Sequence, residues 1–268
     1  MKTYLSLFKI KIASALQYRA AAIAGVSTQV FFGLVFIMVY LAFYESNDTS
    51  NAPMNIQALI NYIWLNQAFY SLTYIWIKDK DLISMIKNGN IAYELCRPIN
   101  FYFKWYSTMY ANRIANVTLR FGLCVLIAFI LPSPYHLTLP ISLSAFVLFI
   151  FGLILSSLIV TSIAIIYHLV VFFTLDEKGI MTFLMVFGEI FSGGTVPISF
   201  FPKALQFVAN ILPFRYVCDL PFRIYSGDIT VNAAIPDLLL GVGWFIVLVI
   251  FGYLLSKKAL KNACVQGG

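Results

Sequence analysis

The sequence predicts an all-α polytopic membrane protein with about six transmembrane helices, an N-terminal interfacial helix and a re-entrant external segment before the last helix. Three observations support this fold class. Hydrophobic residues make up 61% of the 268 residues and charged residues only 11%, whereas soluble domains carry about 25% charged residues. The apolar residues occur in long runs instead of the alternating pattern of a membrane barrel. Basic residues gather in only some of the polar connections, as they do in polytopic proteins.

Six apolar stretches are assigned as membrane spans, because about 20 apolar residues cross the hydrocarbon of a bilayer. They lie at residues 20–44, 56–77, 106–131, within 137–175, from 180 onward, and at 234–255. The fourth run is too long for one perpendicular crossing, so we expect it to start along the outer interface. Its polar residues are expected to face other helices: Ser156, Ser157, Thr161 and Ser162. No polar segment is long enough for a soluble domain, so residues 1–268 form one membrane domain.

Residues 1–19 are predicted to form an amphipathic helix in the cytoplasmic interface of the membrane. An apolar stripe recurs there at helical spacing: Leu5, Phe8, Ile12 and Leu16. Lys9 and Lys11 lie off this stripe, where anionic headgroups attract them. The two lysines also exclude a secretory signal, which needs an apolar core at that place. The alternative is that this segment is only the charged start of the first span.

The distribution of Lys and Arg predicts the orientation of the chain, since basic residues accumulate in cytoplasmic loops. Basic residues occur at both ends of the chain and in the loop 78–104, whereas the polar loop 45–53 has none. Both termini and the loop 78–104 are therefore expected on the cytoplasmic side. The net charge of +7 follows from this orientation and does not indicate a nucleic-acid partner.

The loop 78–104 is predicted to contain a short amphipathic helix. Asp79 or Asp81 favours its N-terminus, and Gly89 favours its end. Its apolar patch consists of Leu82, Ile83, Met85 and Ile86. A helix of this kind, projecting into the cytosol without a domain of its own, indicates docking onto a partner protein. The alternative is a helix that rests on the membrane surface.

The segment 179–227 starts as a membrane helix but cannot continue as one. After about 14 residues, fewer than a span needs, Ser192-Gly193-Gly194 interrupts it, and Pro197 and Pro202 each remove a backbone donor. Non-helical backbone at membrane depth survives only where protein or a water-filled cavity satisfies its polar groups. The apolar stretch 203–212 ends at Pro213 and is too short to span. We therefore predict a re-entrant segment over 192–227, with a loop on the membrane surface as the alternative.

Several isolated charged or polar residues have two possible roles. Arg120 either reaches the membrane edge with its long side chain or pairs with a partner such as Glu189. His168, near the inner end of the fourth span, is interpreted as a packing residue and not as a proton carrier. If residues 216–225 are helical, Asp219 is four residues from both Arg215 and Arg223 and can pair with either.

Motifs for catalysis and metal binding are absent from the sequence. There is no GxxxxGK phosphate loop, no HExxH and no GxSxG. The four cysteines have neither CxxC spacing nor regular pairing, so we expect free thiols and no metal site. An intramembrane enzyme is therefore disfavoured.

Four short motifs follow one another along the chain. The inner loop contains one motif, Asn88-Gly89-Asn90 through Leu95-Cys96-Arg97-Pro98. The segment before the last span contains the others, which are Ser192-Gly193-Gly194-Thr195-Val196-Pro197, then Phe200-Phe201-Pro202, then Leu212-Pro213-Phe214-Arg215-Tyr216. In their order and spacing, over essentially the whole chain, these motifs make the sequence resemble the membrane subunits of ABC-2 type transporters, particularly bacterial permeases with one six-helix domain. Glu189 departs from that pattern, which has an apolar or small residue there, so no family role is carried over to it.

The resemblance implies a complex in the bacterial inner membrane, in which this chain pairs with a second permease chain and two separate ABC ATPase subunits bind beneath. ATP and Mg would be bound by those subunits, and this chain would bind no cofactor. Residues 1–19 would be the interfacial connecting helix, 78–104 the coupling loop, and 192–227 the external gate. The residues expected to contact the ATPase are Asp79, Asp81, Leu82, Ile83, Met85, Ile86 and Arg97.

The resemblance further implies an exporter whose pathway lies between the two permease chains. The second and fifth spans are expected to line it, and the candidate pathway and gate residues are Asn66, Phe187, Glu189, Phe191, Pro197 and Phe201. ATP-driven closure of the ATPases would switch this pathway from inward-facing to outward-facing. The alternative function is a pore or lipid-scrambling protein that works without nucleotide, and a copurifying ATPase would discriminate between the two.

Overall fold

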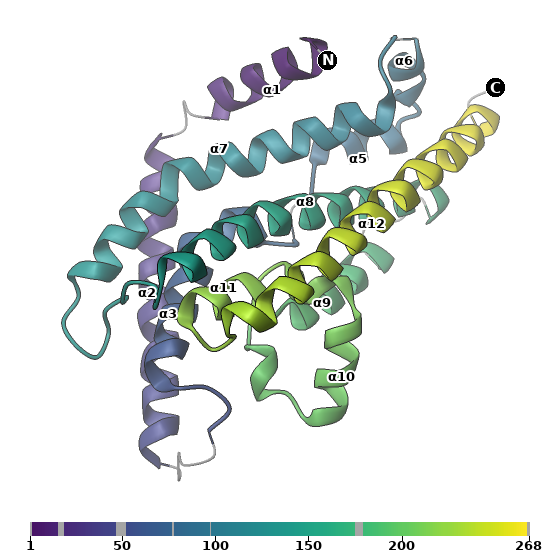
Figure 1. The fold of residues 1–268 in the computed structure, drawn as a ribbon. Helices are drawn as coiled ribbons and strands as arrows, with labels where there is room; N and C mark the ends of the chain where they lie inside the picture. Colours follow the sequence, from purple (N-terminus) through teal and green to yellow (C-terminus); the bar gives the residue numbers. More distant parts are fainter. Residues whose placement is uncertain are drawn as a thin grey trace.

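The computed structural model of the chain describes residues 2–15, 19–46, 52–76, 78–96, 98–174 and 179–266. Within these ranges every regular element is helical, which confirms the predicted all-α class. Four long helices form the frame: α2 (Arg19–Ser46), α7 (Phe101–Ile130), α8 (Leu143–Thr174) and α12 (Val231–Gln266). Figure 1 shows α8 in the middle of the molecule, between α7 and α12.

These four helices are long and apolar enough to cross a membrane, over Ala22–Ser46, Phe101–Ile130, Leu143–Thr174 and Val231–Lys261. They correspond to the predicted first, third, fourth and last spans. The shortest of the four stretches has 25 residues, which at about 1.5 Å per residue exceeds the roughly 30 Å of hydrocarbon. The last helix continues past the predicted end at 255, so Lys257 and Lys258 lie on helical turns.

The predicted second and fifth spans are shorter helices. The second is divided into α3 (Ile56–Ala68) and α4 (Tyr70–Thr73), with Phe69 between them. The fifth, α9 (Ile180–Ser192), has 13 residues, as α3 does. At about 1.5 Å per residue each is roughly 20 Å long, less than the hydrocarbon thickness. The described structure thus has four full-length apolar helices and two interrupted segments.

The interior is built around α8. Its predicted inward-facing polar residues are all almost completely buried: Ser156, Ser157, Thr161 and Ser162. Ser156 Oγ donates to the Val217 carbonyl at 2.5 Å, and a Cβ on Gly152 would lie 3.2 Å from Pro221 Cβ. Small residues along α8 therefore let the segment after α9 approach its backbone closely, as is typical of helices packed in membranes.

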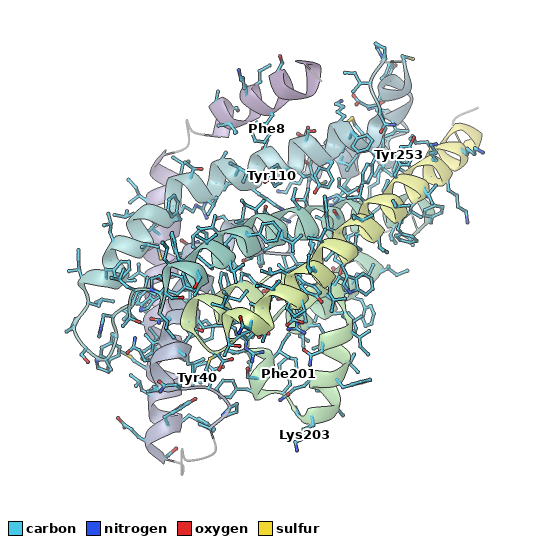
Figure 2. All side chains as sticks on the ribbon, viewed as in Figure 1. Phe8, Tyr40, Tyr110, Phe201, Lys203 and Tyr253 are labelled. Atoms are coloured by element: carbon cyan, nitrogen blue, oxygen red, sulfur yellow. The ribbon has the colours of Figure 1, made fainter. Side chains whose placement is uncertain are left out.

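The short elements gather at two opposite ends of the molecule. The first group is α1 (Lys2–Ala15), α5 (Lys80–Lys87) and α6 (Ile91–Leu95). The N-terminus, α6 and the C-terminal end of α12 lie together at the top of Figure 1, and we call this the terminal end. The second group is η2 (Ile198–Phe200), α10 (Lys203–Ile211), η3 (Pro213–Tyr216) and α11 (Asp219–Ser226). Lys203 marks the opposite tip in Figure 2, which we call the α10 end.

The N-terminal segment is helical over Lys2–Ala15, and Leu16 lies outside the described residues. The helix packs beside α7, where the rings of Phe8 and Tyr110 are stacked with centroids 6.2 Å apart (Figure 2). Ile10 on another side is 65% exposed. The predicted helix is therefore present, and its position in a membrane interface stays a prediction.

Candidate functional site

A cavity of about 360 Å³ lies where the two interrupted segments meet α2. It falls at the lower end of the range for small-molecule pockets, about 300–1,000 Å³. Residues from α2, from the α3–α4 segment, from α9 and from the loop after α9 line it: Thr28, Gln29, Phe32, Phe36, Asn66, Gln67, Tyr70, Tyr74, Glu189, Gly194 and Thr195. Non-helical backbone at membrane depth needs such a setting, and both interruptions border this cavity.

The wall formed by α4 depends on Arg113 of α7. The helix stops at Thr73 because Tyr74 has extended backbone angles, φ −62° and ψ 126°. Arg113 Nη1 donates to the carbonyls of Leu72 at 3.0 Å and of Tyr74 at 2.7 Å, and the side chain is 1% exposed. A cation is favourable at a helix C-terminus, where carbonyls lack partners. The same stretch brings the rings of Tyr70 and Tyr74 into a stack with centroids 4.5 Å apart.

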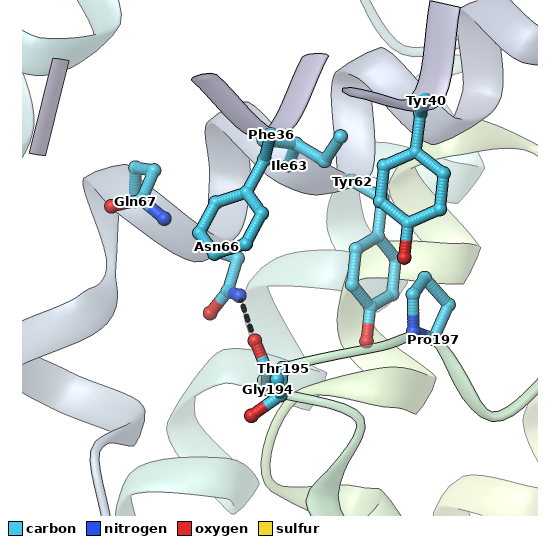
Figure 3. Close-up of a pocket in the computed structure, with 9 residues that line it drawn as sticks. All are labelled: Phe36, Tyr40, Tyr62, Ile63, Asn66, Gln67, Gly194, Thr195 and Pro197. Carbon is cyan, nitrogen blue, oxygen red and sulfur yellow. Dashed lines mark hydrogen bonds between the residues drawn. The ribbon is translucent and has the colours of Figure 1, made fainter. Parts of the chain in front are cut away.

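The opposite wall is formed where α9 ends. Gly193 adopts φ +80°, the left-handed region that favours glycine, and its carbonyl accepts from Tyr62 Oη at 2.8 Å. The next carbonyl, of Gly194, accepts from Asn66 Nδ2 at 2.5 Å, as Figure 3 shows. A Cβ on Gly194 would lie 2.5 Å from Glu189 Oε1, so a side chain at this position would displace the carboxyl group.

The predicted pathway residues separate into two groups. Asn66 and Glu189 line the cavity, and Pro197 lines a small adjoining cavity with Tyr40 and Tyr62 (Figure 3). The three phenylalanines Phe187, Phe191 and Phe201 instead belong to a satellite apolar cluster, in which the rings of Phe187 and Phe191 are 4.6 Å apart. The structure thus brings Asn66 and Glu189 together and places the phenylalanines beside them.

The cavity also contains residues that sequence reasoning missed. Gln29, Tyr70 and Tyr74 were not among the predicted residues. Gln29 is 5% exposed, and neither Oε1 nor Nε2 has a hydrogen-bond partner in the described part of the chain. It is the only amide within residues 20–44, and this isolated polar group in a predicted span was an available signal. The end of α4, after which Tyr74 is extended, is bonded to Arg113 of α7 and gave no such signal.

The α10 end is held together by charged residues of α11. Asp219, completely buried, accepts from the Ile198 backbone N–H at 3.0 Å and pairs with Arg223 Nη1 at 3.2 Å. Arg223 Nε also contacts Asp228 at 2.6 Å. The predicted Asp219–Arg223 pair is therefore present. The predicted Arg215–Asp219 pair was wrong, because Arg215 lies in η3 before α11 and pairs with Asp237 of α12 at 2.6 Å.

Arg120 does not pair with Glu189 in the described structure. Arg120 Nη1 lies 3.5 Å from Ser71 Oγ, and a Cβ on Gly25 would lie 2.9 Å from its Cζ atom. Its guanidinium group therefore occupies the junction of α2, α4 and α7. Arg120 is not among the residues that line the cavity.

At the terminal end, α5 covers Lys80–Lys87, within the predicted helix. Asp79 is its N-cap and accepts from the Leu82 N–H at 3.0 Å. Leu82, Ile83 and Ile86 are 1%, 5% and 6% exposed, because they pack against the chain's own core. Met85 is only partly buried, and Asp81 is exposed. Arg97 lies outside the described residues.

His168 of α8 joins α5 to the membrane helices. It is completely buried, and its Nε2 accepts from the Asp79 backbone N–H at 2.8 Å. Its Nδ1 lies 2.6 Å from the Ala164 carbonyl, which can only accept a hydrogen bond. The two contacts therefore fix a neutral ring with the proton on Nδ1. Asp79 thus belongs to the attachment of α5, through both its side chain and its backbone.

Comparison with known proteins identifies the family of the chain. No match to the chain is found among curated proteins. A family model described as "ABC-2 family transporter protein" matches residues 34–266, which include α3 to α11 and all of α12. The match spans most of the chain and covers both interrupted segments and the short helices of both ends except α1, whereas the cavity residues Thr28, Gln29 and Phe32 lie before it. The chain belongs to the ABC-2 transporter family.

Proposed function

We propose that this chain is the permease subunit of an ATP-driven exporter in a bacterial inner membrane. It would form the translocation pathway with a second permease chain, and two separate ABC ATPase subunits would supply the energy. The sequence itself contains no GxxxxGK motif for nucleotide binding. The hydrolysis that drives transport must therefore come from another polypeptide.

The observation that carries this proposal is the exposed face at the terminal end. Both chain ends lie there beside α6 (Figure 1), on the side where the basic residues predict cytosol. Lys80, Asp81, Ser84 and Lys87 on α5 are exposed, and Tyr93 on α6 is 73% exposed. Because the apolar residues of α5 face its own chain, an ATPase would contact this charged face. Asp81 is the predicted docking residue best placed for such a contact.

The two interrupted segments support a pathway rather than a purely structural role. With α3–α4 and α9 counted as crossings, the chain would have six spans, and 192–227 would lie at the outer mouth. A break in a spanning helix leaves backbone polar groups that protein or a water-filled cavity must satisfy. Here both breaks border one cavity that contains an acidic residue, Glu189, and a buried amide, Gln29. Intramembrane ionisable residues of this kind are typical of substrate pathways.

Affinity purification of the tagged chain in mild detergent, with mass identification of copurifying chains, tests the proposal. We expect an ABC ATPase in roughly one-to-one ratio with the permease chains. We also expect ATP-dependent transport only when the ATPase is present in reconstituted liposomes. Full activity of the isolated chain without nucleotide would refute the proposal and favour a pore or lipid-scrambling protein.

A further inference from the structure

The cavity between α2, α3–α4 and α9 contains polar atoms that the chain itself leaves without partners. Both amide atoms of Gln29 and the Oε2 atom of Glu189 have no hydrogen-bond partner in the described structure. Gln29 is 95% buried, so it does not reach bulk solvent. A buried polar group without a partner destabilises the fold, and natural proteins retain few of them. Two such residues lining one cavity indicate that the missing partner enters the cavity from outside.

The three atoms define what that partner must present. Gln29 Oε1 accepts hydrogen bonds and Gln29 Nε2 donates them. Glu189 Oε2 accepts when the carboxyl group is ionised. The neighbouring polar groups are already used in part, since Asn66 Nδ2 donates to the Gly194 carbonyl and Thr28 Oγ1 donates to the Ala24 carbonyl. A partner with at least one N–H donor therefore matches the cavity better than a pure acceptor.

The remainder of the lining favours a flat apolar body with no negative charge. Phe32, Phe36 and the stacked pair Tyr70–Tyr74 provide aromatic surface, which packs best against another ring or flat group. None of the lining residues is Lys or Arg, and Glu189 is the one acidic residue among them. An anion would therefore lose its hydration and face a carboxyl group without a compensating cation.

We propose that this cavity binds a flat apolar molecule with an N–H donor, either an amine or a primary amide, and that it excludes anions. Gln29 determines this specificity by holding the donor group, and Glu189 adds selectivity for an amine. The inference rests on the proposed transport function, for which it names the class of substrate. Gly194 completes the site, because any side chain there would occupy the space beside Glu189 Oε1.

Binding of four matched naphthalene probes to the purified full chain in lipid nanodiscs tests this inference. The probes are naphthylmethylamine, naphthamide, naphthoate and methylnaphthalene, measured by equilibrium dialysis without nucleotide and corrected with empty nanodiscs. We expect the amine and the amide to bind roughly tenfold or more tightly than the carboxylate and the hydrocarbon, because only they offer N–H donors.

Variants assign the binding to the proposed residues. Gln29→Leu should weaken the amine and the amide by about tenfold, the effect of one lost hydrogen bond in a buried site. Glu189→Gln should weaken the amine more than the amide. Gln57→Leu is the matched control, since Gln57 lies outside this cavity and contacts the His136 carbonyl. Gln29→Asn, which keeps the amide but shortens the side chain, replaces Gln29→Leu if the latter does not fold.

Three results would overturn the inference. The first is equal binding of all four probes, and the second is unchanged amine binding by folded Gln29→Leu or Gln29→Asn. The third is no binding to the folded wild-type protein beyond that to empty nanodiscs, which would mean that the cavity holds only water. Failure of this inference can be distinguished from failure of the proposed function. A chain that copurifies with an ATPase but fails these tests refutes only the inference, whereas selective probe binding without any ATPase partner refutes only the ATP-driven mechanism.

Discussion

Two short helices at opposite ends of the molecule, α11 and α5, are attached by different interactions. At the α10 end, the buried carboxylate of Asp219 joins α11 to the loop after α9, and Arg223 connects it to Asp228. At the terminal end, α5 is attached by buried apolar side chains, and the Asp79 N–H before it donates to His168. The first attachment is a directional network of charged groups, and the second is mainly apolar contact.

This difference indicates which end can move without breaking the fold. Apolar contacts are non-directional, so α5 can shift along its contact surface at small cost. A buried ion pair fails abruptly, because separating the partners leaves an uncompensated charge. We therefore expect α11 to hold one geometry or to release it completely, and α5 to follow a bound partner gradually.

Replacement of Asp219 by Ala should have the largest effect on stability. It leaves Arg223 with one partner and the Ile198 N–H with none, so we expect a loss of about 3–5 kcal/mol. Thermal unfolding in detergent, followed by the fraction of monodisperse protein, measures it. Asp81→Ala serves as a control, since Asp81 is an exposed acidic residue on α5. Equal unfolding temperatures for wild type and Asp219→Ala would remove the contrast between the two ends.

Gly193→Ala should follow, with a loss of about 2–3 kcal/mol, because the residue has φ +80° and a Cβ would lie 2.7 Å from Tyr62 Oη. Tyr62→Phe removes that hydroxyl group and by itself should cost about 1 kcal/mol. The double variant should be less unstable than the sum of the two single changes, as thermal unfolding would show. Strict additivity would mean that the hydroxyl group does not constrain this position.

His168→Ala should cost about 1–2 kcal/mol, since it leaves the Asp79 N–H without its acceptor. Its larger consequence is expected in coupling: in the reconstituted complex, less substrate should be transported per ATP hydrolysed. His168→Gln, whose side-chain carbonyl can accept the same hydrogen bond, should restore part of this ratio. An unchanged ratio in His168→Ala would show that α5 transmits motion without this contact.

Asp81→Lys should change stability least, within about 0.5 kcal/mol, because the side chain is exposed. The variant should nevertheless lose ATPase subunits during affinity purification, since the charge reversal lies on the proposed docking face. Ser84→Lys adds a positive charge on the same exposed side without removing the acidic group, and it should weaken the association less. Full ATPase recovery with Asp81→Lys would move the docking surface away from α5.

The sequence predicted the long helices well, because their hydropathy depends only on local composition. It also located the α9 interruption at Ser192-Gly193-Gly194 and the α10 helix before Pro213, since glycine and proline act locally. It missed the end of the second segment at Thr73, where α4 stops before the predicted end of the span. The carbonyls of Leu72 and Tyr74 there accept hydrogen bonds from Arg113, about 40 residues further along the chain, and no local pattern encodes that contact.

The sequence predicted only part of the candidate site, because it shows local features but not which surfaces contact each other. Asn66 and Glu189 were recognised as polar groups in apolar runs, and they do line the cavity. The apolar patch of α5 was expected to face a partner, and the structure turns Leu82, Ile83 and Ile86 towards the chain's own core. An amphipathic pattern predicts that one face is covered but does not say by what. Contacts with ATPase subunits, including one at Arg97, stay a prediction.

The position of Arg113 has a mechanical consequence for the cavity. Its guanidinium group connects the middle of α7 to the two carbonyls that end α4, and it is enclosed on all sides. A sliding or tilting movement of α7 must therefore carry the Tyr70–Tyr74 wall with it, or else strand a cation in a dry environment. Leaving this buried cation without its hydrogen-bond acceptors carries a large free-energy penalty. Tyr70 and Tyr74 are therefore expected to move together with α7, although they lie far from it in the sequence.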